Sequence, residues 1–396
     1  MSSQVKIGTA VDHAGAPSPH DSRKPQNPIK LPANSWKYIA KRALSKFSTD
    51  GCTDLAAALT YYGVLSLFPA ILALVSIVGL LGQKEETTKV MLDLIGQLGG
   101  TKVSEAVAEP VKALAGSSAA GWAFALGLLT ALWSASGYVG AFSRAMNRVY
   151  GTDEGRPVWK LRPTLLLVTL GAVLLVAAIA LMLVISGPLA RVIGNVLGVG
   201  DAAVIVWNTA KWPVVAILAI ALIAVLYYFT PNVRQPKFRW ISIGASVALI
   251  AMVLASIGFF FYVANFSKYN KTYGSIAGVI VLLLWIWILN LMLLLGAQVD
   301  AELERGRQLQ AGIKAESQLM LPPRDTTASA KKREKHMLLV AQGKSMRRRA
   351  ALEAGLGSGL EATAEKRVLW WTVAAGATMV LVSAIRRRRI ANTDKP

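Results

Sequence analysis

The stretch Ser275–Val299 reads SIAGVIVLLLWIWILNLMLLLGAQV and contains no Asp, Glu, Lys, Arg or His. At about 1.5 Å per residue, a helix of this length crosses the roughly 30 Å hydrocarbon core of a bilayer. Five more uncharged stretches precede it in the chain: Leu55–Leu81, Ala119–Ser143, Thr164–Ala190, Pro213–Thr230 and Ile241–Val263. The sequence therefore predicts an all-α, polytopic membrane protein with six transmembrane helices.

The composition supports this class. Of 396 residues, 54% are hydrophobic and 16% are charged, whereas soluble domains carry roughly 25% charged residues. Lys and Arg outnumber Asp and Glu by 43 to 22, which gives a net charge of +21. The single cysteine, Cys52, excludes an intramolecular disulfide framework and a Cys-rich zinc module. We predict neither a metal nor a cofactor.

The distribution of positive charge predicts the orientation. Lys and Arg number 15 in one set of alternate flanks of the six stretches and 8 in the other set. Because cationic segments resist translocation, both ends of the six-helix core are expected in the cytoplasm. No apolar run precedes Leu55, so we expect no cleavable signal peptide and a first span that acts as the insertion signal.

The chain is predicted to have five parts. They are a disordered leader (1–35), a basic amphipathic helix on the inner leaflet (36–50), the membrane core (51–307), a basic cytoplasmic tail (308–367) and an apolar helix with an Arg-rich end (368–396). The outer loop 83–118 is expected to form two short helices, and a further helix is expected at about 330–354. Two alternatives stay open for Val368–Ile385, which either lies on the membrane surface or crosses it as a seventh span against the charge rule.

Several classes of chemistry lack their residues. All three histidines, His13, His20 and His336, lie in polar tails, so no buried metal site or Ser-His pair is expected and no catalytic residue is predicted. A phosphate-binding loop of the GxxxxGK[ST] type does not occur. The six uncharged stretches contain no ionisable side chain, which disfavours simple proton antiport. Sodium coupling through backbone carbonyls stays open.

Uncharged polar side chains are candidates for a path through the membrane. They are Thr60, Tyr61, Tyr62 and Ser66 in the first span, Ser134 in the second, and Asn270 and Tyr273 at the start of the sixth. The alternative is that such groups form hydrogen bonds between helices, as we expect for Asn290 and Gln298. Pro69, Gly274 and Gly278 are assigned to helix packing, the two glycines because they lie four residues apart on one helical face.

Charges at the predicted cytoplasmic ends are candidates for an inner gate. Asp54 precedes the first span, Arg144 and Arg148 follow the second, and Asp300 follows the sixth. The alternative is ordinary salt bridges at the membrane surface.

The expected partners are lipids. The basic tails favour anionic lipid, at about 1 kcal/mol per cation near the surface. They lack the interleaved aromatic residues of a base-stacking platform, so nucleic acid is not expected as a partner. Assembly as a homo-oligomer stays open.

Several stretches together resemble the YihY/BrkB family of bacterial inner-membrane proteins, once labelled ribonuclease BN-like. The matching stretches are AAALTYYGVLSLFP (56–69), LWSASG (132–137), RAMNRVYG (144–151), YFTPN (228–232), YNKTYGS (269–275), Leu284-Trp285 and LLGA (294–297). They occur in the right order within about Trp36 to Arg307.

The resemblance implies a six-helix protein of the bacterial cytoplasmic membrane whose biochemical role is poorly defined, with virulence attached to some members. We expect transport, channel or flippase-like movement of a small or amphipathic cargo. An envelope scaffold that does not transport is the second hypothesis. A tRNA-processing ribonuclease is the third and is disfavoured, because that chemistry needs a His/Asp metal cluster.

Overall fold

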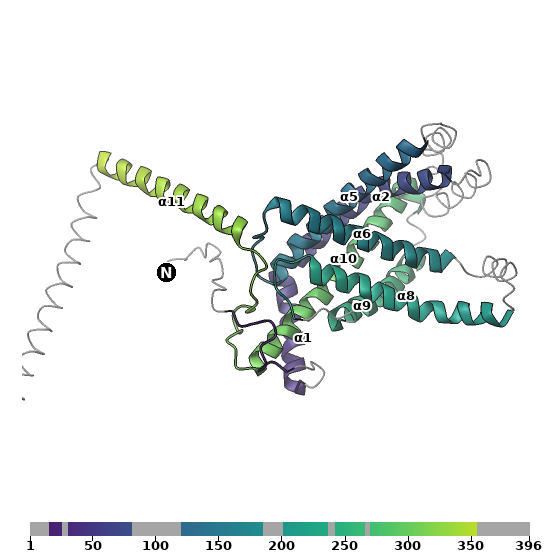
Figure 1. Ribbon diagram of the computed structural model, residues 1–396, viewed down its shortest axis with the longest axis horizontal. Coiled ribbons are helices and arrows are strands. Elements are labelled where there is room, and N and C mark those ends of the chain that lie inside the picture. Colours follow the sequence, from purple (N-terminus) through teal and green to yellow (C-terminus); the bar gives the residue numbers. More distant parts are fainter. Residues whose placement is uncertain are drawn as a thin grey trace, which may run out of the picture. The chain divides into compact units, whose positions relative to one another are not determined.

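The computed structural model of the protein describes residues 16–25, 31–80, 120–184, 201–236, 242–265 and 270–354. The regular elements of this part of the chain are helices, as predicted (Figure 1). Their bounds are α1 Ala33–Thr49, α2 Cys52–Leu80, α5 Ala120–Val149, α6 Val158–Val184, α8 Asp201–Phe229, α9 Ile243–Asn265, α10 Asn270–Gln310 and α11 Thr327–Glu353. The predicted outer-loop helices and the apolar stretch Val368–Ile385 lie outside the described residues.

Four of these helices contain segments long and apolar enough to cross a membrane: Val158–Ala180, Val206–Phe229, Ile243–Ala264 and Gly278–Gln310. The helices α2 and α5 have 29 and 30 residues and begin and end near the first two predicted stretches. At 41 residues α10 is about 60 Å long, roughly twice the thickness of the hydrocarbon core. The last part of α10 therefore extends beyond any span that it forms.

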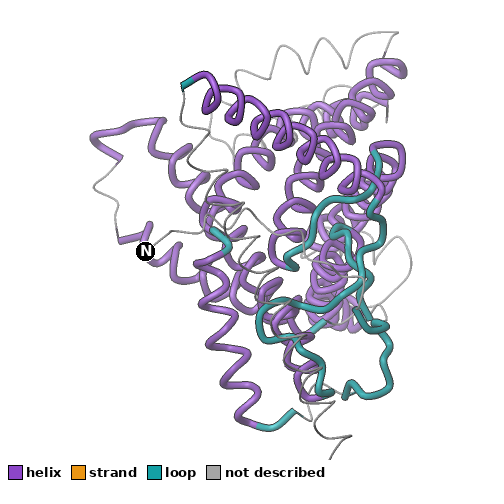
Figure 2. Tube along the Cα trace, turned by 90° about the vertical axis from the view of Figure 1, so that its left-hand side faces the viewer, coloured by secondary structure: helices purple, strands orange, loops and turns teal. Residues whose placement is uncertain are grey.

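The six long helices converge at one end, where α2, α6 and α9 begin and α5, α8 and α10 end (Figure 1). We call this the packed end. Here α2 packs against α5, α9 against α10 and α6 against α8, while α10 also contacts α1, α2 and α5. Figure 2, which looks onto this end, shows the loops that connect the helices there.

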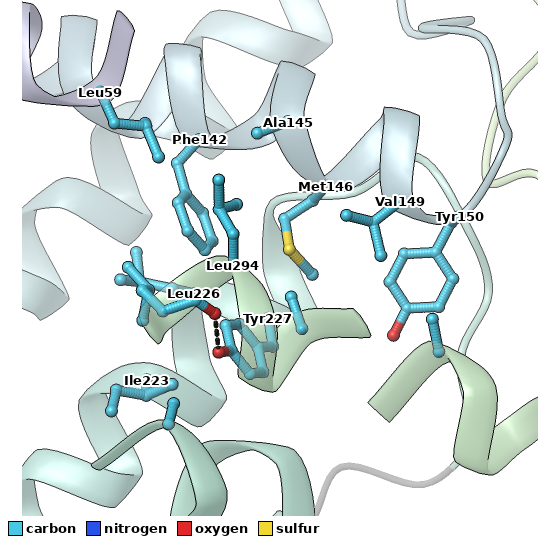
Figure 3. Close-up of a cluster of buried hydrophobic side chains, with 14 of the residues drawn as sticks. Leu59, Phe142, Ala145, Met146, Val149, Tyr150, Ile223, Leu226, Tyr227 and Leu294 are labelled. Atoms are coloured by element: carbon cyan, nitrogen blue, oxygen red, sulfur yellow. Dashed lines mark hydrogen bonds between the residues drawn. The ribbon is translucent and has the colours of Figure 1, made fainter. Parts of the chain in front are cut away.

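A single cluster of buried apolar side chains holds the packed end together (Figure 3). The Phe142 ring stacks between those of Tyr138 and Tyr227, with centroids 6.5 and 6.1 Å away. The Tyr227 hydroxyl donates a hydrogen bond to the carbonyl of Leu293 in α10. The cluster thus joins all six long helices; among its members are Leu59, Phe142, Ala145, Met146, Leu165, Ile223, Tyr227, Ala248 and Leu294.

The other part of the bundle is packed differently. We call residues 61–66, 129–135, 170–183, 206–220, 249–264 and 278–289 the open half. Among the described side chains of the open half, only Lys211 and Phe259 are buried. Large apolar side chains such as Trp133, Ile217 and Phe261 are more than half exposed. In lipid such exposure carries no hydrophobic penalty, so the helices can stand apart there.

Helices α9 and α10 approach each other closely at two glycines. A Cβ added to Gly244 would overlap the carbonyl oxygen of Gly296, and a Cβ added to Gly296 would overlap that of Gly244. Gly278, by contrast, has nothing within 4 Å of an added Cβ. The close helix approach predicted at Gly278 is therefore not seen, since α10 has room there for a side chain.

Helix α1 coincides with most of the predicted amphipathic helix, but its buried face meets protein. Ile39 and Ala43 are its buried apolar residues, and Ile39 packs with Leu31 and with Leu303 of α10. The sequence-based assignment of this stripe to lipid is corrected: α10 is longer than the hydrocarbon core is thick, and its last turns provide apolar surface for α1.

Part of the predicted leader is also held against α10. The Lys24 ammonium lies 2.9 Å from a carboxylate oxygen of Glu304, and both side chains are buried. Arg307 donates a hydrogen bond of 2.9 Å to the Pro25 carbonyl. For residues 16–25, the expectation of disorder is thus corrected, because α10 provides the counter-charge for the leader.

The predicted domain boundary after Arg307 is displaced along the chain. Ile313, Ala315, Leu319 and Leu321 are buried, and the chain divides into two compact units after Ser329. The part of α11 that belongs to the second unit, residues 330–353, has nearly all of its side chains exposed. The helix expected at about 330–354 is confirmed as α11.

Candidate functional site

A chain of polar side chains joins α5, α10 and α2. The Tyr138 hydroxyl donates to Asn290 Oδ1 at 2.9 Å, and Asn290 Nδ2 donates to Thr60 Oγ1 at 3.3 Å. Thr60 and Asn290 are buried. Eight residues separate Thr60 from the start of α2, so this layer lies about 12 Å along the helix, where the packed end meets the open half. The expectation that Asn290 bonds neighbouring helices is confirmed.

Two tyrosines of the predicted path stand beside this layer. The Tyr61 side chain is 61% exposed, and its ring meets that of Tyr62 edge to face at 5.4 Å. The half-buried ring of Tyr62 lies under the Arg144 guanidinium, 5.6 Å from the ring centroid. Tyr61 is thus the path candidate that is free to contact a molecule in the open half.

The two serines of the predicted path bond to backbone. Ser66 Oγ donates to a carbonyl of its own helix at 2.6 Å, and Ser134 Oγ donates to the Leu65 carbonyl at 3.2 Å, which links α5 to α2. The side-chain environments of the remaining candidates lie outside those that the structure describes: Pro69, Asn270, Tyr273 and Gly274.

The four charges of the predicted gate do not pair with one another in the structure. Asp54 and Arg148 are exposed, and the exposed Arg144 lies over Tyr62. Asp300 accepts hydrogen bonds from Ser242 Oγ and from the Gly244 amide at 2.7 Å, so it caps the start of α9. Among these four described residues no ion pair forms. Equal depth in the membrane thus does not bring these charges to the same side of their helices, and the gate stays a prediction.

Instead, the packed end is connected by Arg156, which lies in the α5–α6 connection and is 6% exposed. Its guanidinium bonds both carboxylate oxygens of Glu154, at 2.8 and 2.7 Å. It also donates to the Thr230 carbonyl at 2.7 Å and to Ser143 Oγ at 3.2 Å. One side chain thus ties the end of α5 to the end of α8.

Asn232, which is fully buried, extends these links to a third segment. Its Nδ2 donates to the carbonyls of Asp153 and Asp325 at 2.9 and 2.8 Å, and its Oδ1 accepts from the Asp325 amide at 3.1 Å. Its own amide donates to Asn147 Oδ1 at 2.7 Å. Sequence reasoning missed this role. The signal was present, because Asn147 and Asn232 lie in two stretches that carry the family resemblance.

The segment after α10 completes this connection. Pro322 accepts from the Arg234 amide at 2.8 Å, and Val233 and Pro323 form an isolated antiparallel bridge. The Arg324 guanidinium donates to the Val233 carbonyl at 2.9 Å and lies 5.4 Å from the Tyr228 ring centroid. We call residues 319–326 the clasp, since this segment joins the loops of the packed end.

An ion pair at the end of the clasp involves Asp325. The Lys160 ammonium lies 2.8 Å from its carboxylate, and Thr327 donates to it through its hydroxyl and its amide, at 2.7 and 2.8 Å. These hydrogen bonds, that from Lys160 first, hold the pKa of the Asp325 carboxyl well below its usual range.

A second set of buried charges lies on the last turns of α10. Glu302, 1% exposed, pairs with Arg305 at 2.8 Å and with Arg42 of α1 at 3.2 Å. Glu304 pairs with Arg307 at 2.6 Å, besides its contact with Lys24. These carboxylates bind the N-terminal elements to the bundle, which is a role different from the gate that sequence reasoning considered for this region.

The apolar segment of α8 contains one ionisable residue, Lys211. Lys211 was counted in an outer flank, before Pro213, but α8 begins at Asp201 and the apolar segment Val206–Phe229 includes Lys211. The uncharged stretch predicted from Pro213 thus begins later than the apolar segment of α8, and Lys211 lies near the start of that segment. Lys211 is 6% exposed, and its ammonium donates to Asn208 Oδ1 at 3.2 Å.

Comparison with known proteins places this arrangement among bacterial membrane proteins. The chain is 28% identical over 269 residues to the ribonuclease-like protein YfkH of Bacillus subtilis, which covers 68% of this chain and 96% of YfkH. It is 26% identical over 273 residues to a UPF0761 membrane protein of Vibrio campbellii, which covers 68% of this chain and 81% of that protein. A UPF0761 membrane protein of Aggregatibacter aphrophilus is 23% identical, with 69% and 94% covered. No solved structure matches.

The sequence model of the family described as Virulence factor BrkB matches residues 43–319. This range begins in α1, contains the six long helices and ends where the clasp begins. The resemblance seen in the sequence is confirmed, and the protein is a multi-pass membrane protein that belongs to the BrkB (YihY, UPF0761) family.

Proposed function

We propose that the protein moves a small or amphipathic molecule across the bacterial cytoplasmic membrane by way of the open half of its bundle. The observation that carries this proposal is the asymmetry of burial. One end of the bundle is closed by a continuous core, and the other buries only Lys211 and Phe259 among its described side chains. A bundle closed at one end and loosely packed at the other is the arrangement expected of one state of an alternating-access carrier.

The proposed topology has six spans, with the packed end in the cytoplasm. Four helices meet the length and hydropathy expected of a span, and α2 and α5 have comparable lengths. The flanks at the packed end carry 15 Lys and Arg, against 7 at the other end when Lys211 is counted within α8. A cationic flank favours the cytoplasmic side, and the cationic tails would then meet anionic lipid of the inner leaflet.

The proposed path runs along α2, α5 and α10. The layer of Thr60, Asn290 and Tyr138 forms the floor of the open half, and Tyr61 stands exposed beside it. A cargo that passes this floor requires the packed end to separate. The hydrogen bonds of Arg156 and Asn232 are the links that would break, since they join the loops on that side.

The test uses a strain that lacks this protein, profiled for lipids and metabolites, and complemented with variants of the full chain. Tyr61→Ala is expected to leave the altered compound uncorrected at normal membrane abundance, since the exposed ring is lost. Phe261, an aromatic residue of α9 outside the proposed path, is also more than half exposed, so Phe261→Ala is the matched control and is expected to restore the normal level of the compound. If Tyr61→Ala and Tyr138→Phe, each tested as a single variant, both restored the compound fully, the proposed path would be contradicted.

One observation favours a second function, that of an envelope scaffold. Residues 330–396 form a compact unit of their own, and the described part of α11 exposes clusters of cations: Lys331, Lys332, Arg333, Lys335, Arg347, Arg348 and Arg349. A chain that ends after Ser329 keeps the clasp. A carrier should keep its function in this truncation, whereas a scaffold that binds partners through its tail should lose it.

We further propose that the protein is not a ribonuclease, although one relative is named ribonuclease-like. The support is the sequence: the three histidines lie at positions 13, 20 and 336, outside the membrane core. Purified protein, incubated with tRNA and Mg²⁺, Mn²⁺ or Zn²⁺, is expected to leave the RNA intact. Metal-dependent cleavage that co-purifies with the protein would overturn this proposal.

A further inference from the structure

We propose that the open half contains a binding site for an oxyanion, the phosphate or carboxylate group of an amphipathic ligand, and that Lys211 is its cation. That the ligand is the transported cargo rests on the proposed transport function. That an oxyanion binds at Lys211 is argued from the surroundings of Lys211 alone.

Lys211 is one of the few buried residues of the open half. Among the described side chains of the open half, only Lys211 and Phe259 are buried. The next residues along α8, from Trp212 to Val214, are exposed. Asn208, Val215 and Leu218 are at least partly covered, and at three, four and seven residues from Lys211 they share its helical face. The lysine therefore lies on the face of α8 that is turned toward the bundle.

The lysine lacks a counter-ion among the described residues. Its ammonium donates one hydrogen bond, to Asn208 Oδ1 at 3.2 Å, and lies 5.7 Å from the centroid of the Trp212 ring. An ammonium has three donors, and no described carboxylate pairs with this one. Neither α6 (Val158–Val184) nor α9 (Ile243–Asn265), the two helices that pack most against α8, contains an acidic residue. The nearest acidic residue on α8, Asp201, is ten positions away, about 15 Å along the helix.

A cation in this position is costly unless an anion joins it. Ionisable residues within membrane segments pair with one another or mark the path of a ligand. Lysines that only reach toward water at the membrane surface keep their charged end exposed, whereas Lys211 is 6% exposed. Because the chain provides no described partner for its two remaining donors, an external oxyanion is the group that completes this site.

The surroundings also indicate an amphipathic ligand. Val206, Trp212 and Ile217 on the same helix are each more than half exposed. They offer apolar surface within two turns of the ammonium, where a hydrocarbon chain could lie while its charged group meets Lys211. Trp212 beside Lys211 matches the pairing of aromatic and cationic side chains found where the hydrocarbon core meets the headgroups.

The experiment measures ligand binding by the full chain, purified in a neutral detergent. The probes are short-chain phosphatidylglycerol, short-chain phosphatidylcholine and inorganic phosphate, each titrated against the thermal unfolding temperature. Phosphatidylglycerol is expected to stabilise the wild type, and Lys211→Met is expected to weaken its binding by about tenfold or more. Lys211→Arg should retain most of the affinity. Lys331→Met, which removes an exposed cation of α11, is the charge-matched control and should bind as the wild type does.

The two sources of the oxyanion give different results. Stabilisation by phosphatidylglycerol alone assigns the site to a lipid headgroup, and stabilisation by inorganic phosphate as well assigns it to a free oxyanion; both depend on Lys211. Equal binding of phosphatidylglycerol by the wild type and by Lys211→Met, or equal stabilisation by phosphatidylcholine, would overturn the proposal.

A second measurement does not depend on the folding of a variant. An amine-reactive reagent is applied to the wild type with and without phosphatidylglycerol, and acylation of Lys211 is followed by mass spectrometry of its peptide. Protection of Lys211 by the anionic lipid is expected, while exposed lysines react at unchanged rates. Absence of protection would contradict the site. If binding holds but the deletion strain shows no altered compound, the transport proposal fails and the site remains.

Discussion

Asn232 offers the sharpest test of how the packed end is held closed. Its side chain makes three hydrogen bonds, donating to the carbonyls of Asp153 and Asp325 and accepting from the Asp325 amide. Asn232→Ala removes all three and leaves buried backbone groups unpaired. At about 1 kcal/mol for each bond, with further cost for the unpaired groups, the clasp should lose about 3 to 5 kcal/mol.

The assay is limited trypsin digestion of the purified full chain, followed at Arg324. In the wild type the Arg324 guanidinium is bonded to the Val233 and Tyr228 carbonyls, so cleavage after Arg324 requires local opening of the clasp. Where opening is fast relative to cleavage, a loss of about 3 kcal/mol raises the cleavage rate by about 100-fold. Arg234→Ala, two residues along the same loop with an exposed side chain, is the matched control and should leave cleavage at Arg324 unchanged. A rate for Asn232→Ala within about twofold of the wild type would show that the clasp is held by other contacts.

Three further perturbations test other parts of the structure. Glu302→Gln removes the buried carboxylate that pairs with the buried Arg305 and the partly exposed Arg42, and it should lower the free energy of unfolding by about 3 to 5 kcal/mol. The exposed Glu316→Gln should change little, and equal melting temperatures of the two variants would refute the role of these pairs. Gly296→Ala should destabilise the protein by about 1 to 3 kcal/mol, because the added Cβ would overlap the carbonyl of Gly244. Gly258→Ala, where an added Cβ meets nothing, should be neutral or stabilising. The opposite order of stability would refute the close approach of α9 and α10. Folding lowers the pKa of Asp325, so the stability that its ionised carboxylate contributes is complete above its ordinary pKa near 4 and is lost as pH falls toward the lower folded value. The melting temperature of the wild type should therefore fall more between about pH 5 and pH 3 than that of Asp325→Asn. Parallel melting curves of the two proteins against pH would refute the assignment.

The helices of this protein could be predicted because membrane-length apolar runs leave few alternatives. What the runs could not give were the helix bounds. The uncharged stretch predicts a span that starts at Pro213, yet this proline lies inside α8, which begins twelve residues earlier. Proline in a membrane helix is tolerated when neighbouring groups satisfy the freed carbonyl, so it is a weak stop signal. The same error placed Lys211 in a loop.

The contacts that close the packed end could not be predicted, because most of their hydrogen-bond acceptors are backbone carbonyls. Arg156 and Asn232 bond mainly to backbone carbonyls, at Thr230, Asp153 and Asp325. Every residue has a carbonyl, so no sequence pattern distinguishes the few that meet a buried guanidinium or amide. Charges, by contrast, are visible in a sequence, and the predicted gate was assembled from them. The structure separates Asp300 from Arg144 and Arg148, because the fold, and not the depth of a residue, decides which side of a helix faces a partner.

Lys211 bears on which cargo and which driving ion the few charges in the apolar segments allow. A carrier driven by protons usually needs acidic or histidine side chains that exchange protons at mid-membrane, and Lys211 has no described acidic neighbour. One lysine therefore does not restore the case for proton antiport. It supplies a fixed positive charge on the inward face of α8, where an anionic cargo would gain most and a cationic cargo would be repelled. The same residue that corrects the sequence-based count of charges thus narrows the cargo, under the proposed function, to molecules that carry an oxyanion.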